Sequence, residues 1–444
     1  MCQPTVDATG PSLGHSAMQT TELRQDSLLS LATILPPAFA GFFVAFGCWT
    51  LFAVIGVHVR TQLGLTDIQF GLLLALPILS GGVIAVPAGI LAQRFGARSV
   101  MLGCLAGLIP IMALLSWVES LWSYFLVACG LGLAGGTFSS GLQFLSNRAP
   151  PRHRGLALSL FTVGMLGAGF NYYLVSVVHE AYSWRAAPMA YLVLLVVVTA
   201  LYALLTEPDT RPTNYHGPNR KPGNIGLLYN ADVLLLCLLF AVTGGGILAL
   251  ALWLPDFISA SFDLPLNHGA RLATGFIAPA ALCQVLGGWL ADRCGAVPVL
   301  RRALMASLIP GLLLSYPTMS LAVEGSRGLI HLQIALPLAV EIGLIGLLGV
   351  TLGIALGSLL RLLVELQPER TAFCAGLMLL SGCLAGFLLP LLFAMANHWI
   401  GIRSAAFMLL FGFSAVSLWA LTLHSRRYIR RRLLKGEKPL SPWG

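Results

Sequence analysis

The chain has 444 residues, of which 57% are hydrophobic and only 10% are charged, and its mean hydropathy is +0.84. In soluble domains about a quarter of the residues are charged, so this composition excludes an ordinary soluble protein. The formal net charge of +9 would suit a nucleic-acid partner by its sign, but its distribution along the chain argues against one.

Long apolar runs follow one another through most of the chain. A bilayer core of roughly 30 Å requires about 20 apolar residues per helix. Runs without polar alternation favour helices over a β-barrel. The sequence predicts twelve spans, over residues 36–59, 68–91, 99–117, 121–145, 155–178, 186–205, 231–254, 271–291, 297–318, 333–360, 371–396 and 402–423. The expected fold class is an all-α polytopic membrane protein with twelve transmembrane helices.

The N-terminal segment, residues 1–35, is mostly polar and lacks the basic start and apolar core of a cleaved signal peptide. We expect a disordered cytoplasmic tail there. In the first span Phe42, Phe46 and Trp49 recur at i, i+4 and i+7 and so share one helical face. Such a stripe more often packs helices than lines a binding site, but Phe46 and Trp49 are candidates for substrate contact.

Glycine and serine are concentrated in spans 4 and 5, as in GLGLAGGTFSSG at 130–141. Small residues let helix backbones approach closely in lipid, where apolar burial gives no net attraction. This pattern indicates tight helix packing, helices that slide during transport, or both.

The chain is an internal duplication. GILAQRFGA at 89–97 returns as GWLADRCGA at 288–296, an offset of 288 − 89 = 199 residues. Residues 206–230 contain four prolines and three glycines and are expected to form a cytoplasmic linker. The linker separates two pseudo-symmetric six-helix halves, 36–205 and 231–424. This arrangement is typical of secondary transporters, whose sites lie near mid-membrane between the halves.

The distribution of basic residues indicates the orientation of the chain in the membrane. If the N-terminus is cytoplasmic, 21 of the Lys and Arg residues lie on the inner side and five lie outside. This bias follows the positive-inside rule, so we expect both termini, including the basic tail 425–444, to be cytoplasmic. The basic tail could also touch anionic lipid. The expected location is a bacterial-type inner (plasma) membrane, with the lipid bilayer and not nucleic acid as the partner. Nine scattered cysteines without a C-x-x-C spacing are expected to pack as small apolar residues.

The repeated loops resemble the signature loops of the major facilitator superfamily, between helices 2 and 3 and helices 8 and 9. The wider chain resembles the nitrate/nitrite porter family within it. The matching stretches are FFVAFGCW (42–49), LGLTDIQFGLLLALPILSG (63–81), GLGLAGGTFSSG (130–141), LPDFISASFDL (254–264) and GLMLLSGCLAGFLLP (376–390). The resemblance implies the major facilitator fold, alternating access and a small-molecule substrate, with or without a coupling ion, in a monomer without cofactor or metal.

The substrate residues of that family are only partly present. Its two anion-binding arginines fall at Ala85 and Gln284, and the asparagine of its helix 5 glycine motif falls at Met165. Its aromatic pair in helix 7 falls at Phe240 and Gly244. Phe138 keeps the aromatic character of helix 4, and Arg361 stands where a basic residue closes helix 10. Phe138, Phe240, Thr243 and Gln284 are therefore further candidates for substrate contact.

These losses bear on the substrate. An inorganic anion buried in a membrane requires compensating charge or dense hydrogen-bond donation, and paired arginines supply both. The Gln284 amide offers two donors without charge, and Ala85 offers none. A neutral or amphiphilic substrate is as consistent with these residues as nitrate, and nitrate bound by two arginines is disfavoured. Gln284 could equally make a structural bond between helices.

The signature loops are candidate gates. They contain Gly89, Gln93, Arg94, Gly96, Gly288, Asp292, Arg293 and Gly295. Asp292 is expected to face a helix N-terminus or an arginine and hold the cytoplasmic side closed, with Arg293 bridging phosphate or carboxylate groups. Its counterpart Gln93 keeps hydrogen bonding but has no charge, so this half of the gate should be weaker.

Buried acids that could relay protons are scarce. Glu341 lies 361 − 341 = 20 residues before Arg361, about 30 Å along a helix, which places it near the outer surface. An interfacial carboxylate explains it better than proton coupling. A solute transporter is the preferred function, and a receptor or assembly scaffold on a transporter fold is the alternative. A membrane enzyme is disfavoured, because the spans contain no nucleophile–base or metal-ligand cluster.

Overall fold

The computed structural model describes residues 32–434, apart from 210–225, 227–228, 317–318, 326–327, 335 and 401–403. In this part of the chain, twelve helices are long and apolar enough to cross a membrane, which confirms the predicted fold class. The expected N-terminal tail thus lies mostly outside the described residues, as do most of the linker and the end of the C-terminal tail.

The two halves have the same order of helices. The first half contains the span Ala32–Leu63, helical over 32–49 and then as α2 (Phe52–Leu63), followed by α3 (Asp67–Phe95), α4 (Ala97–Leu115), α5 (Leu121–Leu131), α6 (Leu133–Arg148), η1 (Pro151–His153), α7 (Arg154–Thr162), η2 (Val163–Leu166), α8 (Gly167–Ala181), η3 (Trp184–Ala186) and α9 (Ala187–Leu205). The second half contains α11 (Ala231–Ser261), α12 (Leu266–Cys294), α13 (Ala296–Leu314), β1 (Met319–Gly325), β2 (Gly328–Ile334), α14 (Leu338–Leu366), η4 (Pro368–Arg370), α15 (Thr371–Ile400) and α16 (Ala405–Leu434).

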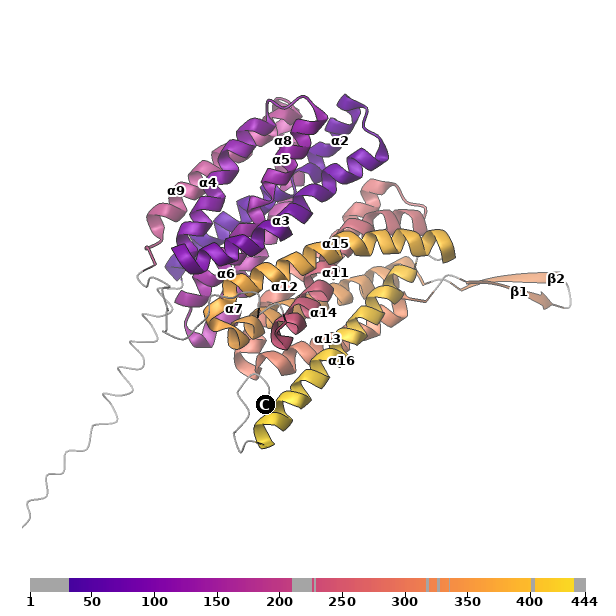
Figure 1. Cartoon of the computed structure of the whole chain (residues 1–444). Coiled ribbons are helices and arrows are strands. Elements are labelled where there is room, and N and C mark those ends of the chain that lie inside the picture. Colours follow the sequence, from indigo (N-terminus) through magenta and orange to yellow (C-terminus); the bar gives the residue numbers. More distant parts are fainter. Residues whose placement is uncertain are drawn as a thin grey trace, which may run out of the picture.

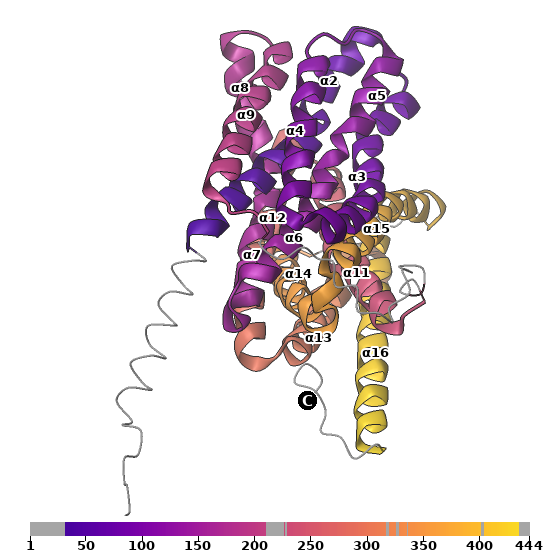
Figure 2. The ribbon, with the colours of Figure 1, turned by 60° about the vertical axis from the view of Figure 1, so that its left-hand side comes forward.

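The halves form two helix bundles (Figure 1, indigo to magenta above and pink to yellow below). Figure 2 shows the same division after rotation, with α15 lying against the first half. Because the spans alternate in direction, both signature loops and the described chain ends fall on one end of the bundle, here called the signature face. The β1–β2 hairpin projects from the opposite end, here called the hairpin face (Figure 1).

Local sequence signals explain several helix boundaries. Thr66 and Gln69 form a capping box before α3, in which each side chain accepts a hydrogen bond from the other residue's backbone N–H. Between α3 and α4, and again between α12 and α13, the chain turns at a single glycine. Gly96 and Gly295 have φ values of 92° and 85°, which side chains rarely permit, so both signature loops require glycine.

The first span is interrupted near its middle. The helix breaks at Thr50 and Leu51, where Leu51 N–H donates to Cys48 O instead of Gly47 O. The amide Nδ2 of Asn171 in α8 supplies the missing donor to Gly47 O at 2.9 Å and also bonds Thr50 Oγ1 at 2.9 Å. Tyr191 donates its hydroxyl proton to Asn171 Oδ1. A helix interruption inside a membrane is tolerated where protein groups satisfy the freed backbone in this way.

The structure differs from the sequence expectation at three places. Residues expected to begin the tenth span belong to β2, and α14 begins only after Pro337. Conversely, α16 continues to Leu434, into the expected C-terminal tail. Residues 206–209 of the linker are held against the first half: Asp209 pairs with Arg148 at 2.7 Å and accepts from Arg98 N–H at 3.1 Å.

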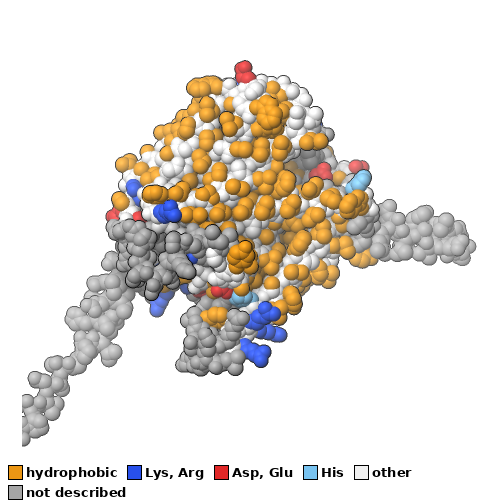
Figure 3. Space-filling view, viewed as in Figure 1, with side chains coloured by type: hydrophobic (Ala, Val, Ile, Leu, Met, Phe, Trp, Pro, Cys, Tyr) orange, Lys and Arg blue, Asp and Glu red, His pale blue; other side chains and the backbone are white. Residues whose placement is uncertain are grey.

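The outer surface of the spans is apolar. Figure 3 shows hydrophobic side chains over most of the visible face, with Lys and Arg gathered along the edge that belongs to the signature face. Large side chains such as Leu126 (73% exposed) and Leu204 (81% exposed) lie on this surface within spans. In a bilayer these side chains would contact lipid.

Candidate functional site

The surface between the halves has two equivalent seams. In the first seam α3 packs on α15, and in the second α12 packs on α7. A methyl group added at Gly89 would lie 2.4 Å from Ala372 O, and one added at Gly288 would lie 2.3 Å from Gly155 O. The two signature-loop glycines therefore hold equivalent close contacts with the opposite half.

The close contacts between halves lie toward the signature face. Spans 4 and 5 are each divided, so their two ends can be compared directly. On the signature side, α6 packs against α15, and α7 packs against α12 and α14. The close packing of the hairpin-side pieces α5 and α8 is within the first half. The halves are thus joined at the signature face and less closely packed at the hairpin face.

Asp292 ties the second-half signature loop to the first half. Its Oδ1 accepts the N–H of Gly155 at 2.9 Å and its Oδ2 accepts the N–H of Leu156 at 2.8 Å. These are two of the N–H groups that the start of α7 cannot bond within the helix. The Asp292 side chain is 4% exposed, and Arg361 Nε lies 3.5 Å from Oδ1. A buried carboxylate thus meets both partners expected from the sequence, a helix N-terminus and an arginine.

Arg361 extends this connection. Its Nη1 donates to Pro151 O of η1 at 2.8 Å, and its Nε donates to Glu365 Oε1 at 2.8 Å. The guanidinium therefore bonds the first half directly while it compensates two carboxylates of its own half. Asp292 and Arg361 together form what we call the charged latch.

The equivalent contact on the first-half side is neutral. Gln143 Oε1 of α6 accepts the N–H of Ala372, at the start of α15, at 2.9 Å. Gln93, the counterpart of Asp292, has a buried Nε2 that finds no hydrogen-bond partner among the described residues. We call Gln93 and Gln143 the neutral latch. One uncharged hydrogen bond takes the place of two charge-assisted ones.

The signature arginines lie outside these contacts. Arg293 stacks over Trp289 at 4.0 Å, instead of bridging the phosphate or carboxylate groups expected for it. Arg94 is exposed and makes no ion pair with any described residue.

The position of the first family arginine is filled, not empty. Ala85 is fully buried, and a methyl group added at Gly376 of α15 would lie 2.4 Å from Ala85 O. Helix α15 has therefore closed over the space that a longer side chain would need. Met165, at the position of the family asparagine, lies half-buried in η2.

Gln284 makes a hydrogen bond between the halves. Its Oε1 accepts from Thr162 Oγ1, at the end of α7, at 3.1 Å, and the side chain is fully buried. The other polar atom of its amide, Nε2, has no partner within the described part of the chain. Gln284 thus forms a hydrogen bond between helices, and its Nε2 remains unused among the described residues.

Two of the predicted aromatic residues meet between the halves. The rings of Phe138 and Phe240 lie 5.8 Å apart, edge to face, and both side chains are 5% exposed. Phe46 and Trp49 contact each other at 5.3 Å, but Trp49 Nε1 donates to Pro77 O at 2.5 Å, which ties the first span to α3. Thr243 donates to Leu239 O of its own helix. Phe138, Phe240 and Gln284 are therefore the predicted contacts that lie at the surface between halves.

Polar residues with cross-helix bonds that were not anticipated from the sequence include Gln143, Thr162 and Asn171. In the sequence each is a polar side chain within a predicted apolar span. That signal gives no partner, because each partner comes from a distant segment. Within the described residues, no group of three or more His, Cys, Asp and Glu side chains is placed to hold a metal ion.

Comparison with known proteins assigns this architecture. Residues 38–387 match the Major Facilitator Superfamily. A probable nitrate/nitrite antiporter, NarK1, of Thermus thermophilus is 31% identical over 455 aligned positions, which cover 96% of this chain and 99% of that protein. A nitrite extrusion protein of Bacillus subtilis (strain 168) is 28% identical over 417 positions, covering 92% and 96%.

Solved structures agree at the level of the fold. The transporter FucP of the same superfamily, solved in the outward conformation, superposes with a TM-score of 0.66 at 14% identity, covering 88% of this chain and 98% of FucP. The human organic anion transporter MFSD10 gives a TM-score of 0.64 at 15% identity, covering 88% and 99%. The chain belongs to the major facilitator superfamily of membrane transporters.

Proposed function

We propose that the protein is a secondary active transporter that moves a small solute by alternating access, with its signature face and both termini in the cytoplasm of a bacterial-type cell. The 21-to-5 distribution of basic residues supports this orientation. The names of its relatives support solute transport as its activity. It works as a monomer, because each of its two halves supplies one side of the transport path.

The observation that carries alternating access is the pair of latches between the halves. In each latch one side chain accepts hydrogen bonds from the first turn of a helix in the opposite half, Asp292 from α7 and Gln143 from α15, and neither connection is covalent or a large apolar surface. Such bonds can exchange for water when the halves rock apart. With the signature face in the cytoplasm, the structure corresponds to a state closed toward the cytoplasm.

The substrate is held in our proposal by hydrogen bonds and aromatic contact, without paired arginines. Among the described residues, every Arg and Lys of a span lies in its first or last two turns. Gln284 offers an unused polar atom between the halves. Its partner Thr162 directly follows Phe161, which is linked through Phe42 to the Phe138–Phe240 ring pair. These groups suit a small solute that brings little uncompensated charge into the membrane.

Uptake into proteoliposomes tests both the proposed transport activity and the proposed substrate site. Radiolabelled nitrate and nitrite would be compared with small neutral amides and polyols, each measured for saturable flux. A protein without saturable flux for any solute would be a receptor or scaffold, and the transport proposal would fail. Saturable nitrate flux that is unchanged by Gln284→Ala would leave transport standing but refute the proposed site.

A further inference from the structure

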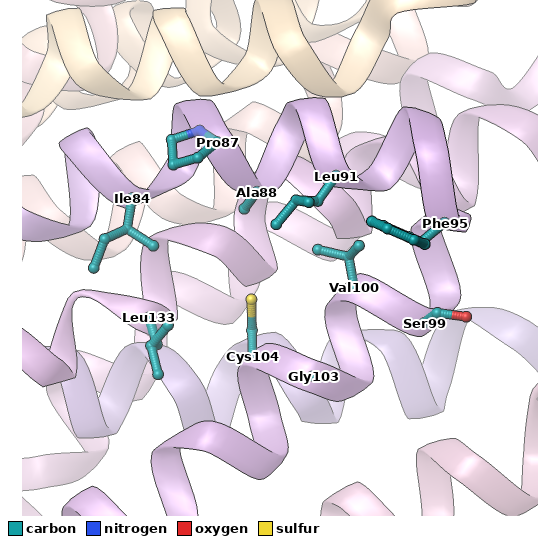
Figure 4. Close-up of a pocket in the computed structure, with 10 residues that line it drawn as sticks. All are labelled: Ile84, Pro87, Ala88, Leu91, Phe95, Ser99, Val100, Gly103, Cys104 and Leu133. Carbon is teal, nitrogen blue, oxygen red and sulfur yellow. The ribbon is translucent and has the colours of Figure 1, made fainter.

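A groove of about 410 Å³ lies between α3 and α4, away from the surface between the halves. Figure 4 shows Ala88, Leu91 and Phe95 of α3 on one side of it and Val100 and Cys104 of α4 on the other. Ala88 and Cys104 are buried and form its floor, while Leu91 and Phe95 are 42% and 69% exposed. Of the lining side chains only Ser99 carries a hydroxyl group, so the groove is apolar along nearly its whole length.

In a bilayer, the groove would face the lipid. Its α3 residues Ile84, Ala88, Leu91 and Phe95 recur at i, i+4, i+7 and i+11, which is one face of the helix. Gly82, Ala85 and Gly89, which meet α15, lie on the other side of the same helix. Since α3 packs on the second half with one face, the groove lies on a different face, where Leu91 and Phe95 are exposed.

The groove exists because small residues stand where larger ones would fill it. A methyl group added at Gly103 would meet no atom within 4 Å. Apolar walls without contact partners lose dispersion energy, so a flexible apolar chain from the surrounding medium is stabilised there. The stretch from Ile84 to Phe95 is about 16 Å long, which accommodates most of one acyl chain.

A cation stands at the end of the groove on the signature face. Arg94 immediately precedes Phe95 in the last turn of α3, is exposed, and makes no ion pair with any described residue. By contrast, the nearby Arg98 and Arg148 are bound by Thr206 and Asp209, respectively. A guanidinium that pairs with no described acid, beside an apolar groove, complements a negatively charged headgroup on an acyl chain.

We propose that the groove between α3 and α4 binds one acyl chain of an anionic phospholipid, whose headgroup pairs with Arg94. The site belongs to one half of the protein and lies outside the transport path. Its occupancy can therefore be measured without any transported substrate.

Native mass spectrometry of the purified full-length protein tests the site with phosphatidylglycerol and phosphatidylcholine. We expect tighter binding of phosphatidylglycerol, reduced about fivefold by Arg94→Gln, as one lost arginine near a charged lipid surface implies. Gly103→Leu fills the groove and should abolish the binding of both phosphatidylglycerol and phosphatidylcholine there. Arg293→Gln, in the equivalent loop of the second half, and Gly412→Leu, at a glycine of α16 with equally open space, are the matched controls.

Two results would overturn the proposal. One is equal binding of the two lipids to the unaltered protein. The other is a preference for phosphatidylglycerol that survives Arg94→Gln or is lost to the same extent in Arg293→Gln. If Gly103→Leu fails to fold, the comparison of Arg94→Gln with Arg293→Gln still decides the matter.

Discussion

Gln143 and Arg361 occupy equivalent positions in the two halves. Each stands five residues before the last residue of its helix, Arg148 in α6 (148 − 143) and Leu366 in α14 (366 − 361). Each also reaches across to the backbone of the opposite half, Gln143 as an acceptor from Ala372 N–H and Arg361 as a donor to Pro151 O. The internal duplication has therefore produced one charged latch and one neutral latch at the same face.

Loss of the Asp292 charge should loosen the charged latch. Asp292→Asn keeps the size of the side chain but replaces one acceptor oxygen with a donor and leaves Arg361 with a single carboxylate. Hydrogen bonds to charged groups contribute about 1.5–3 kcal/mol, so we expect the signature face to open about tenfold more often. The measurement is the maleimide labelling rate of Ser159→Cys, a fully buried position beside this latch, in a cysteine-free background. Asp256→Asn, at an exposed acid of the hairpin face, is the control, and an equal increase there would refute the latch.

A carboxylate in the neutral latch should have the opposite effect. Gln93→Asp places a negative charge near the N-terminus of α15, which such a charge stabilises by about 0.3–1 kcal/mol. We expect the native Cys374, buried in α15, to be labelled up to about fivefold more slowly when it is the only cysteine present. Gln93→Asn has the same size without the charge and should not slow labelling. Unchanged labelling in Gln93→Asp would show that this position does not contribute to closure.

Variants at the Gln284–Thr162 bond can separate a structural role of the Gln284 amide from a role in substrate binding. Thr162→Val removes the bond between halves but leaves the amide in place, so it should alter labelling of the signature face more than substrate affinity. Gln284→Leu removes the unused polar atom as well, and the loss of one hydrogen bond of about 1 kcal/mol should raise the KM for uptake about fivefold. Equal KM values in the two variants would argue that the amide has only a structural role.

The close packing of α15 against Ala85 leads to a steric prediction. Gly376→Ala puts a methyl group 2.4 Å from Ala85 O, so α3 and α15 must move apart and Cys374 should label faster. Gly343→Ala, at a glycine of α14 with open space around it, should leave labelling unchanged. Ala85→Arg should disturb the seam still more. The double variant Ala85→Arg with Gln284→Arg restores both family arginines. It should therefore lower the yield of folded protein instead of improving nitrate uptake.

Asn171 should matter for stability more than for transport. Asn171→Leu leaves Gly47 O, Thr50 Oγ1 and the Tyr191 hydroxyl short of a partner inside the first half. Unsatisfied buried polar groups cost about 1–3 kcal/mol, so the thermal unfolding temperature in detergent should fall. Tyr191→Phe removes only one of the three bonds and should cause a smaller decrease. An unaltered unfolding temperature in Asn171→Leu would contradict the role assigned to this side chain.

The sequence alone determined the class and plan of this protein: twelve spans, two repeated halves, signature loops that turn at Gly96 and Gly295, and the absence of arginine at Ala85 and Gln284. These features depend on local properties, namely the length of apolar runs, the backbone freedom of glycine and residue identity at a motif position. The tertiary structure alone decided which distant groups meet. Asp292 could be expected at a helix N-terminus, but only packing selected α7. Packing also left the Gln93 Nε2 without a partner among the described residues and made Gln143 the acceptor from the start of α15. The sequence also showed that Ala85 is small and offers no donor, but only the tertiary structure shows that α15 packs over it, because the space around a small residue depends on how closely the neighbouring helix approaches.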